Sequence, residues 1–259
     1  MFSFYIKLSA NFIILLVALA GGLFPILVKV NGATKKWLVY GESFAGGIFL
    51  GAGLIHLLPD AQESFNAVIQ SNYPFVFLIC AFSILFLYVI EEGAIKLLTC
   101  RNTECTHAQF QPWLAYLLVI LLSIHSVLAG IALGIETALA SFIIIFIAII
   151  VHKGSAAFAL GVSMRREGLA KNSMMKLMIL FSLMTPLGII FGSVLSSFLK
   201  ANPGHLAEAA FNAIAAGTFI YMAFHIIKVK DEERCVSTLS RLTNFFLGLV
   251  VMAVIAVGL

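Results

Sequence analysis

Hydrophobic residues form eight long runs along this chain, and short polar segments separate them. Each run holds about 20 residues, which is the length that an α-helix needs to cross the hydrocarbon core of a bilayer. The pattern predicts an all-α membrane protein, a bundle of eight transmembrane helices in which residues 1–259 form a single transmembrane domain. The predicted helices span residues 8–29, 38–58, 74–92, 113–135, 141–163, 176–199, 206–228 and 241–259.

The composition agrees with a membrane protein and limits its function. Hydrophobic residues make up 61% of the chain and charged residues 11%, whereas a soluble domain carries about 25% charged residues. The mean hydropathy is +1.07. The connections between the runs are too short to hold a soluble domain. The net charge of +4 therefore does not indicate a nucleic-acid partner.

Basic residues are distributed unevenly over the connections. Of the 16 Lys and Arg residues, Lys7 and Lys200 lie on one side of the predicted bundle, and Lys153 falls within a predicted helix. The other 13 lie in or beside the first, third, fifth and seventh connections. By the positive-inside rule these connections are cytoplasmic and both termini are extracytoplasmic. We expect a multi-pass protein of the cell membrane or an inner membrane.

The first apolar run also has features of a signal peptide. The small residues of Ala18–Gly21 resemble a cleavage site after an apolar stretch. However, the apolar run continues through Val30, and Lys7 is the only basic residue before it. We therefore expect the first helix to be retained in the protein.

The third connection holds a loose pattern of metal-ligating residue types. Cys100, Cys105 and His107 lie close together in the sequence. A disulfide is disfavoured in the reducing cytoplasm. Transient capture of a metal ion and an ordinary connecting loop both remain compatible with the spacing.

Two histidines inside adjacent apolar runs are the strongest candidates for chemistry. His125 lies in the run 113–135 and His152 in the run 141–163, on either side of a short break. If the helices fold back at this break, each histidine lies about thirteen residues from the turn, or roughly 20 Å at the helical rise. Both rings then lie at the same depth. Because an ionisable residue inside a membrane is costly and imidazole is a common metal ligand, the pair predicts a metal site.

Other polar side chains lie nearer to the two predicted membrane surfaces. The outer candidates are His56, Asp60, Glu63 and Glu136, and the inner candidates are Glu91 and His225. His56 and Asp60 are four residues apart, so they share a face if the helix continues past Pro59. Taken singly, each of these residues is typical of a solvated interface position. Taken together, they predict the entrance and exit of a path for a cation.

With these residues the chain resembles the ZIP (zinc/iron-regulated transporter-like) family of divalent metal transporters. The matching segments occur in the family's order and are Ser43–Leu50, His56–Ala61, His125-Ser126 with Gly130, His152-Lys153, Pro186–Gly188 and Ala215–Tyr221. The resemblance covers nearly the whole chain. It implies eight helices with both termini outside, a divalent metal ion as the substrate, with zinc the expected ion, and no cofactor or enzymatic activity.

The resemblance also implies a metal site between the helices at 113–135 and 141–163. Its ligands occupy the positions of His125, Ser126, Ala129, His152, Lys153 and Ala156 in this chain. The family usually has an acidic residue where Ala129 stands, and many members have a carboxylate at the position of Lys153 or Ala156. The residues left as ligands are His125, His152 and Ser126, and Lys153 disfavours a second cation.

Three functions are compatible with these residues. The first is the import of a divalent metal ion, expected to be zinc, by sliding of one helix group against another. The second is a ZIP-like regulator or partner subunit with altered transport, because the acid at the position of Ala129 is missing. The third is an intramembrane zinc hydrolase, which the absence of a carboxylate at the depth of the histidines disfavours. Assembly as a homodimer is an open alternative.

Overall fold

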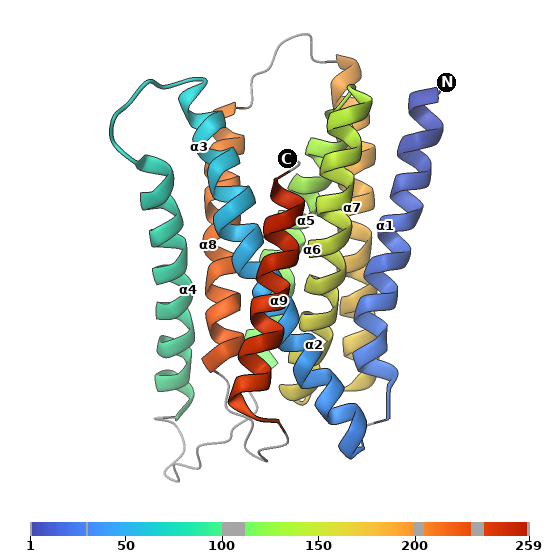
Figure 1. Ribbon diagram of the computed structural model, residues 1–259, viewed down its shortest axis with the longest axis vertical. Coiled ribbons are helices and arrows are strands. Elements are labelled where there is room, and N and C mark those ends of the chain that lie inside the picture. Colours follow the sequence, from blue (N-terminus) through green and yellow to red (C-terminus); the bar gives the residue numbers. More distant parts are fainter. Residues whose placement is uncertain (1, 30, 100–111, 199–204, 229–235, 258–259) are drawn as a thin grey trace.

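The computed structural model describes residues 2–29, 31–99, 112–198, 205–228 and 236–257. Within these ranges the chain is helical, and its long helices run side by side along one axis (Figure 1). The elements are α1 Phe2–Leu27, α2 Gly32–Gly51, η1 Ala52–Leu57, α3 Leu58–Asn66, α4 Phe75–Thr99, α5 Pro112–Ile135, α6 Leu139–Arg166, α7 Lys171–Phe198, α8 His205–Lys228 and α9 Thr238–Ala256.

Eight helical segments in these ranges are long and apolar enough to cross a membrane. The prediction of an all-α bundle with eight membrane spans is therefore confirmed. Helix α1 begins and α9 ends at the same end of the bundle (Figure 1), which we call the terminal end. The opposite end, where α1 leads into α2 and where Arg165 and Arg166 close α6, is called the basic end.

The second span is longer than the sequence predicted. The prediction ended this helix at residue 58, but α2, η1 and α3 continue as one span from Gly32 to Asn66, which crosses the bundle obliquely (Figure 1). Pro59 has no amide hydrogen and normally interrupts a helix. Here η1 is a π-helix, in which the amide of Leu58 donates to the carbonyl of Gly53, five residues earlier. This wider turn accommodates the proline and keeps the chain helical.

Close backbone contacts divide the helices into two groups. The first helix group contains α1, α5, α6 and α7, and a Cβ atom at Gly21 of α1 would lie 2.7 Å from the carbonyl oxygen of Gly154 on α6. The second helix group contains α2, η1, α3, α4, α8 and α9, and a Cβ atom at Gly217 of α8 would lie 2.6 Å from the carbonyl oxygen of Cys80 on α4. Small residues permit this close packing of helices. The groups meet where α2 faces α6 and α5 faces α8.

Aromatic and aliphatic side chains fill the space where the groups meet. Phe49 on α2 and Phe219 on α8 are fully buried, and their ring centroids lie 5.2 Å apart. Phe181 on α7 and Leu160 on α6 belong to the same apolar core. This core surrounds a small set of buried polar side chains half-way along α5 and α6.

Candidate metal site

Ten polar or charged side chains are buried in the described part of the chain. Six of them lie part-way along the three neighbouring helices of the first helix group: His125 and Ser126 on α5, His152 and Lys153 on α6, and Ser182 and Thr185 on α7. Burying polar groups away from water costs free energy unless they are paired or bind a ligand. Their concentration at one level therefore marks a candidate functional site.

Three imidazole rings meet at this level. The ring centroids of His125 and His152 lie 5.6 Å apart, as the mirrored positions of the two histidines predicted. His56, on η1 of the second helix group, brings its ring centroid to 6.5 Å from that of His152. The ring of Phe219 on α8 closes the cluster, with centroids 4.7 Å from His125 and 6.0 Å from His152.

The position of His56 differs from the sequence prediction. The sequence predicts His56 at the outer end of the helix at 38–58. The helix instead continues to Asn66, so His56 lies well inside the bundle, beside His152. Its side chain is 12% exposed. The sequence signal that could have found it is the histidine itself, which stands inside an apolar segment in the same way as His125.

The histidine rings at the centre have nitrogen atoms available for a ligand. Nε2 of His125 makes no hydrogen bond with any described residue. The ring of His152 lies within reach of the backbone carbonyl of Ala148, which leaves its other ring nitrogen for a ligand. Zn–N bonds of about 2.0–2.1 Å at a tetrahedral angle place two ligating rings roughly 5 Å apart, close to the observed separation. As they stand, no three His, Cys, Asp or Glu side chains among the described residues are close enough to enclose a metal ion.

Lys153 occupies the position beside the histidines and contacts Ser126. Its ammonium group donates to Oγ of Ser126 at 2.9 Å and to the carbonyl oxygen of Phe181 at 2.8 Å, and lies 3.5 Å from the centroid of the Phe181 ring. Ser126 was predicted as a metal ligand, and a metal ion would have to compete with Lys153 for its oxygen. A positive charge on Lys153 would also disfavour a second metal ion next to the first.

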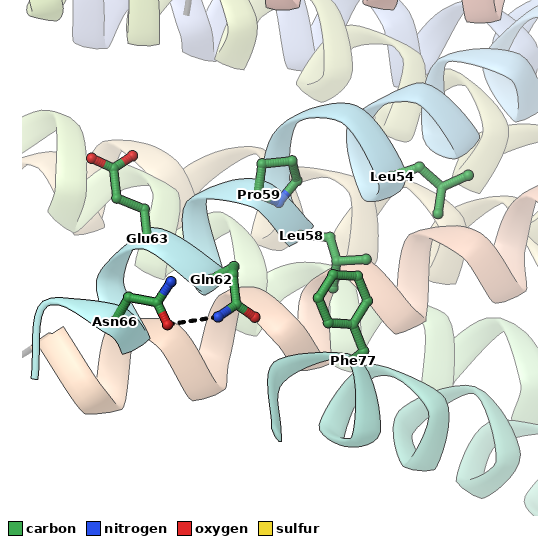
Figure 2. A pocket seen from close by; sticks show the side chains of 7 residues that line it. All are labelled: Leu54, Leu58, Pro59, Gln62, Glu63, Asn66 and Phe77. Atoms are coloured by element: carbon green, nitrogen blue, oxygen red, sulfur yellow. Dashed lines mark hydrogen bonds between the residues drawn. The ribbon is translucent and has the colours of Figure 1, made fainter. Parts of the chain in front are cut away.

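Two of the outer candidates lie on α3 but have different surroundings. Asp60 places Oδ2 3.0 Å from Nδ1 of His56, although the angle is not that of a well-formed hydrogen bond. Glu63 lines a pocket of about 550 Å³ between α3 and α4 (Figure 2). Leu54 and Leu58, which also line this pocket, lie two residues before and after His56 and hence on the opposite face of the helix. Neither His56 nor Asp60 is among the residues that line this pocket (Figure 2).

The third outer acid, Glu136, has a structural contact in the turn between α5 and α6. Its Oε1 accepts hydrogen bonds from the backbone amides of Thr137 and Ala138, both at 2.7 Å. Nearby, the ammonium group of Lys7 donates to the carbonyl oxygen of Gly134 at 2.6 Å. These bonds satisfy backbone groups that would otherwise lack partners between two helices. A role for Glu136 in the path of a cation stays a prediction.

The inner candidates Glu91 and His225 lie together between α4 and α8. Nδ1 of His225 lies 3.4 Å from Oε1 of Glu91, and the hydroxyl of Tyr221 donates to the same carboxylate. Tyr221 follows Phe219 by two residues, about 200° around α8, so it faces α4 while Phe219 faces the central histidines. This cluster lies within the second helix group, and its role in releasing an ion stays a prediction.

A contact between the helix groups at the basic end was missed by the sequence reasoning. Nη1 of Arg166, at the end of α6, donates to Oε1 of Glu42 on α2 at 2.7 Å. The only sequence signal was an acidic residue inside an apolar run, which is a functional candidate in a membrane protein. The pattern of Cys100, Cys105 and His107 lies outside the described residues.

Comparison with known sequences gives these residues a family context. The sequence model of the ZIP zinc transporters matches residues 4–108 and 99–256. The chain is 26% identical to zinc transporter ZIP2 of Mus musculus, and the match covers 97% of each protein. It is 29% identical to zinc transporter ZIP1 of Danio rerio, and the match covers 85% of this chain and 86% of that protein. It is 28% identical to zinc transporter ZIP1 of Homo sapiens, and the match covers 93% of this chain and 89% of that protein.

Proposed function

Because the chain belongs to the ZIP family of zinc transporters, we propose that it imports zinc into the cytoplasm through a histidine-lined site between α5 and α6. Membership of this family makes it a multi-pass membrane transporter of divalent metal ions, not an enzyme. The alternative of an intramembrane zinc hydrolase is therefore set aside. In this function zinc is the substrate that the protein moves and not a resident cofactor.

The observation that carries the proposal is the pair of buried rings at His125 and His152. They lie 5.6 Å apart, and each has a ring nitrogen without a well-formed hydrogen bond to the described residues. Two neutral imidazoles bind a dication more weakly than a site that also contains a carboxylate. Weak binding suits a transporter, because the ion must also leave the site.

Movement of the two helix groups supplies a route for the ion. The site is built on α5 and α6 of the first helix group, and Phe219 of the second helix group covers it. Sliding of the first group along the second would carry the histidines between the two membrane surfaces. The concentration of Lys and Arg near the basic end supports placing that end in the cytoplasm and both termini outside. Transport toward the basic end is then import.

Uptake of radioactive zinc by cells or proteoliposomes tests the proposal. We expect His125→Ala and His152→Ala each to abolish saturable uptake, because each removes one of very few strong ligands at the centre. Ile124→Ala, which changes an exposed neighbour on the same helix, is the matched control and should transport like the parent. Protein amount and elution as a single species establish that each variant is folded. Parent-like uptake by both histidine variants would show that the ion does not use this site.

A second candidate function is a ZIP-like regulator or partner subunit with altered transport. Ala129 in place of the family's acid and the contact of Lys153 with Ser126 favour it. The same assay separates the two functions, since a regulator shows no saturable uptake in the purified parent protein. Assembly as a homodimer stays a prediction.

A further inference from the structure

We infer that anionic phospholipids bind at the corner where α1 leads into α2, and that Lys29 and Lys36 attract their headgroups while Trp37 lies among them. This α1–α2 corner comprises residues 24–29 and 31–40, at the basic end of the bundle (Figure 1). The inference concerns a surface that the proposed function does not use, so it can be tested without reference to the metal ion. It assigns to this end of the protein a preference for one class of lipid.

The length of the second span is the first argument. The span runs over 35 residues from Gly32 to Asn66, which is roughly 50 Å at the helical rise. The hydrocarbon core of a bilayer is about 30 Å thick, and the headgroup layers bring it to about 40–45 Å. Even with its oblique course (Figure 1), a helix of this length extends out of the hydrocarbon core. Lys36 and Trp37, in its first two turns, therefore lie at the depth of the lipid headgroups.

Exposed aromatic and aliphatic side chains at the corner are the second argument. Trp37 is 71% exposed, and the ring of Tyr40 lies edge-on to it with the centroids 6.4 Å apart. Phe24 and Leu27, in the last turn of α1, are 54% and 51% exposed. Trp and Tyr are enriched at membrane interfaces because each combines an apolar ring with a polar group. The exposed surface of the corner is therefore suited to the boundary between acyl chains and headgroups.

Charge is the third argument. Lys29 and Lys36 are exposed, and neither forms an ion pair with a carboxylate in the described part of the chain. Arg166 pairs with Glu42 and lies 4.0 Å from the carboxylate of Glu167, so these two acids do not offset the lysines. Basic residues beside exposed apolar side chains are typical of a surface that binds anionic lipids.

The hydrogen bonds of the corner are the fourth argument. The side chain of Asn31 accepts from the amide of Thr34 at 2.9 Å, and the hydroxyl of Thr34 donates to the carbonyl oxygen of Lys29 at 2.9 Å. From α6, Arg165 donates to the carbonyl oxygen of Val28 at 2.9 Å, which adds a positive charge without using a carboxylate. The basic groups are thus carried by an ordered turn, and a surface that is ordered before binding loses less entropy when it binds.

Quenching of Trp37 fluorescence by brominated lipids measures which lipids lie at the corner. The chain has two tryptophans, so Trp113→Phe leaves Trp37 as the only one. The purified whole chain with this change, called the parent in this test, is reconstituted into phosphatidylcholine vesicles. These vesicles contain the same share of either brominated phosphatidylglycerol, which is anionic, or brominated phosphatidylcholine, which is zwitterionic. The ratio of the two quenching efficiencies gives the enrichment of the anionic lipid at Trp37.

We expect an enrichment of about fivefold or more in the parent at low salt, since each basic residue near an anionic surface strengthens the attraction by about fivefold. The enrichment should fall toward equality in Lys29→Gln/Lys36→Gln, and in the parent it should decline as added sodium chloride screens the charges. The matched control Lys171→Gln/Lys176→Gln removes the same charge from exposed positions of α7 at the same end. It should keep the enrichment of the parent.

Three results would overturn the inference. The first is equal quenching by the two lipids in the parent, or weak quenching by both, which would place Trp37 outside the bilayer. The second is an unchanged enrichment in Lys29→Gln/Lys36→Gln. The third is an equal loss in the control, because the preference would then belong to the net charge of this end and not to the corner. Elution as a single species and an unchanged Tm establish that each variant is folded, and zinc uptake tests the proposed function separately.

Discussion

The ion pair between Glu42 and Arg166 joins the two helix groups at the basic end, and we predict that it stabilises the arrangement seen in this structure. Nη1 of Arg166 lies 2.7 Å from Oε1 of Glu42, and the side chains are 11% exposed for Glu42 and 27% exposed for Arg166. A pair that is largely removed from water is screened less by salt than one on the surface. Breaking it should therefore change how often α2 and α6 separate.

The size of the effect follows from this burial. Removing one partner of a desolvated, hydrogen-bonded charge pair costs about 2–5 kcal/mol. We take about 2 kcal/mol for Glu42→Gln, because Arg166 keeps some contact with water and partly exposed pairs contribute less. This free energy corresponds to roughly a thirtyfold shift in the equilibrium between two arrangements. Arrangements in which the groups have separated at the basic end should become more populated by this factor.

Labelling of a buried cysteine measures this population. Ser163 on α6 is 3% exposed. We expect Ser163→Cys, in a protein without the four native cysteines, to react with a polar maleimide faster when the groups separate. We expect the labelling rate to rise about thirtyfold in Glu42→Gln and to return toward the parent rate in the charge swap Glu42→Arg/Arg166→Glu. Lys36→Gln, an exposed change on the same helix, is the control. A rate in Glu42→Gln equal to that of the control would refute the reasoning.

Other substitutions test the site, the outer surface and the packing. Ala129→Glu should tighten zinc binding about tenfold or more, since it adds a charged ligand one turn from the central histidines; unchanged or weaker affinity in an equilibrium titration would contradict this. Glu63→Gln should raise the KM for zinc at low ionic strength more than it lowers the maximal rate, and a KM that does not depend on salt would exclude an entrance role. Gly188→Ala should lower the Tm of the purified protein, because its Cβ collides with the backbone of α5, whereas Gly93→Ala, with nothing within 4 Å, should not; equal Tm values would contradict this packing.

The fold was accessible from the sequence because a bilayer imposes a simple length on each helix. Seven of the eight predicted spans each correspond to one helix that is long and apolar enough to cross a membrane. The second span could not be delimited, because Pro59 and the polar residues after it read as a helix end. The π-turn that carries the helix past Pro59 depends on a hydrogen bond of unusual spacing, which hydropathy does not encode.

The candidate site was accessible only in part. His125 and His152 were brought together by counting residues from a turn, which is a property of the backbone alone. The contact of Lys153 with Ser126 depends on where a long side chain reaches between three helices, and spacing within one helix does not predict it. The depth of His56 likewise depended on the length of a helix that the sequence pattern cut short.

Lys153 has a consequence for the kinetics of transport. In a site that holds two mobile cations, the arrival of one repels the other and speeds its departure. Here the neighbouring group is the amine of Lys153, which is covalently part of α6 and hydrogen-bonded in place, so an arriving zinc ion has no second mobile ion to displace. Release then depends on movement of the helix groups and not on the next ion. Under the proposed function, each cycle carries a single ion, and the rate saturates with zinc concentration without cooperativity.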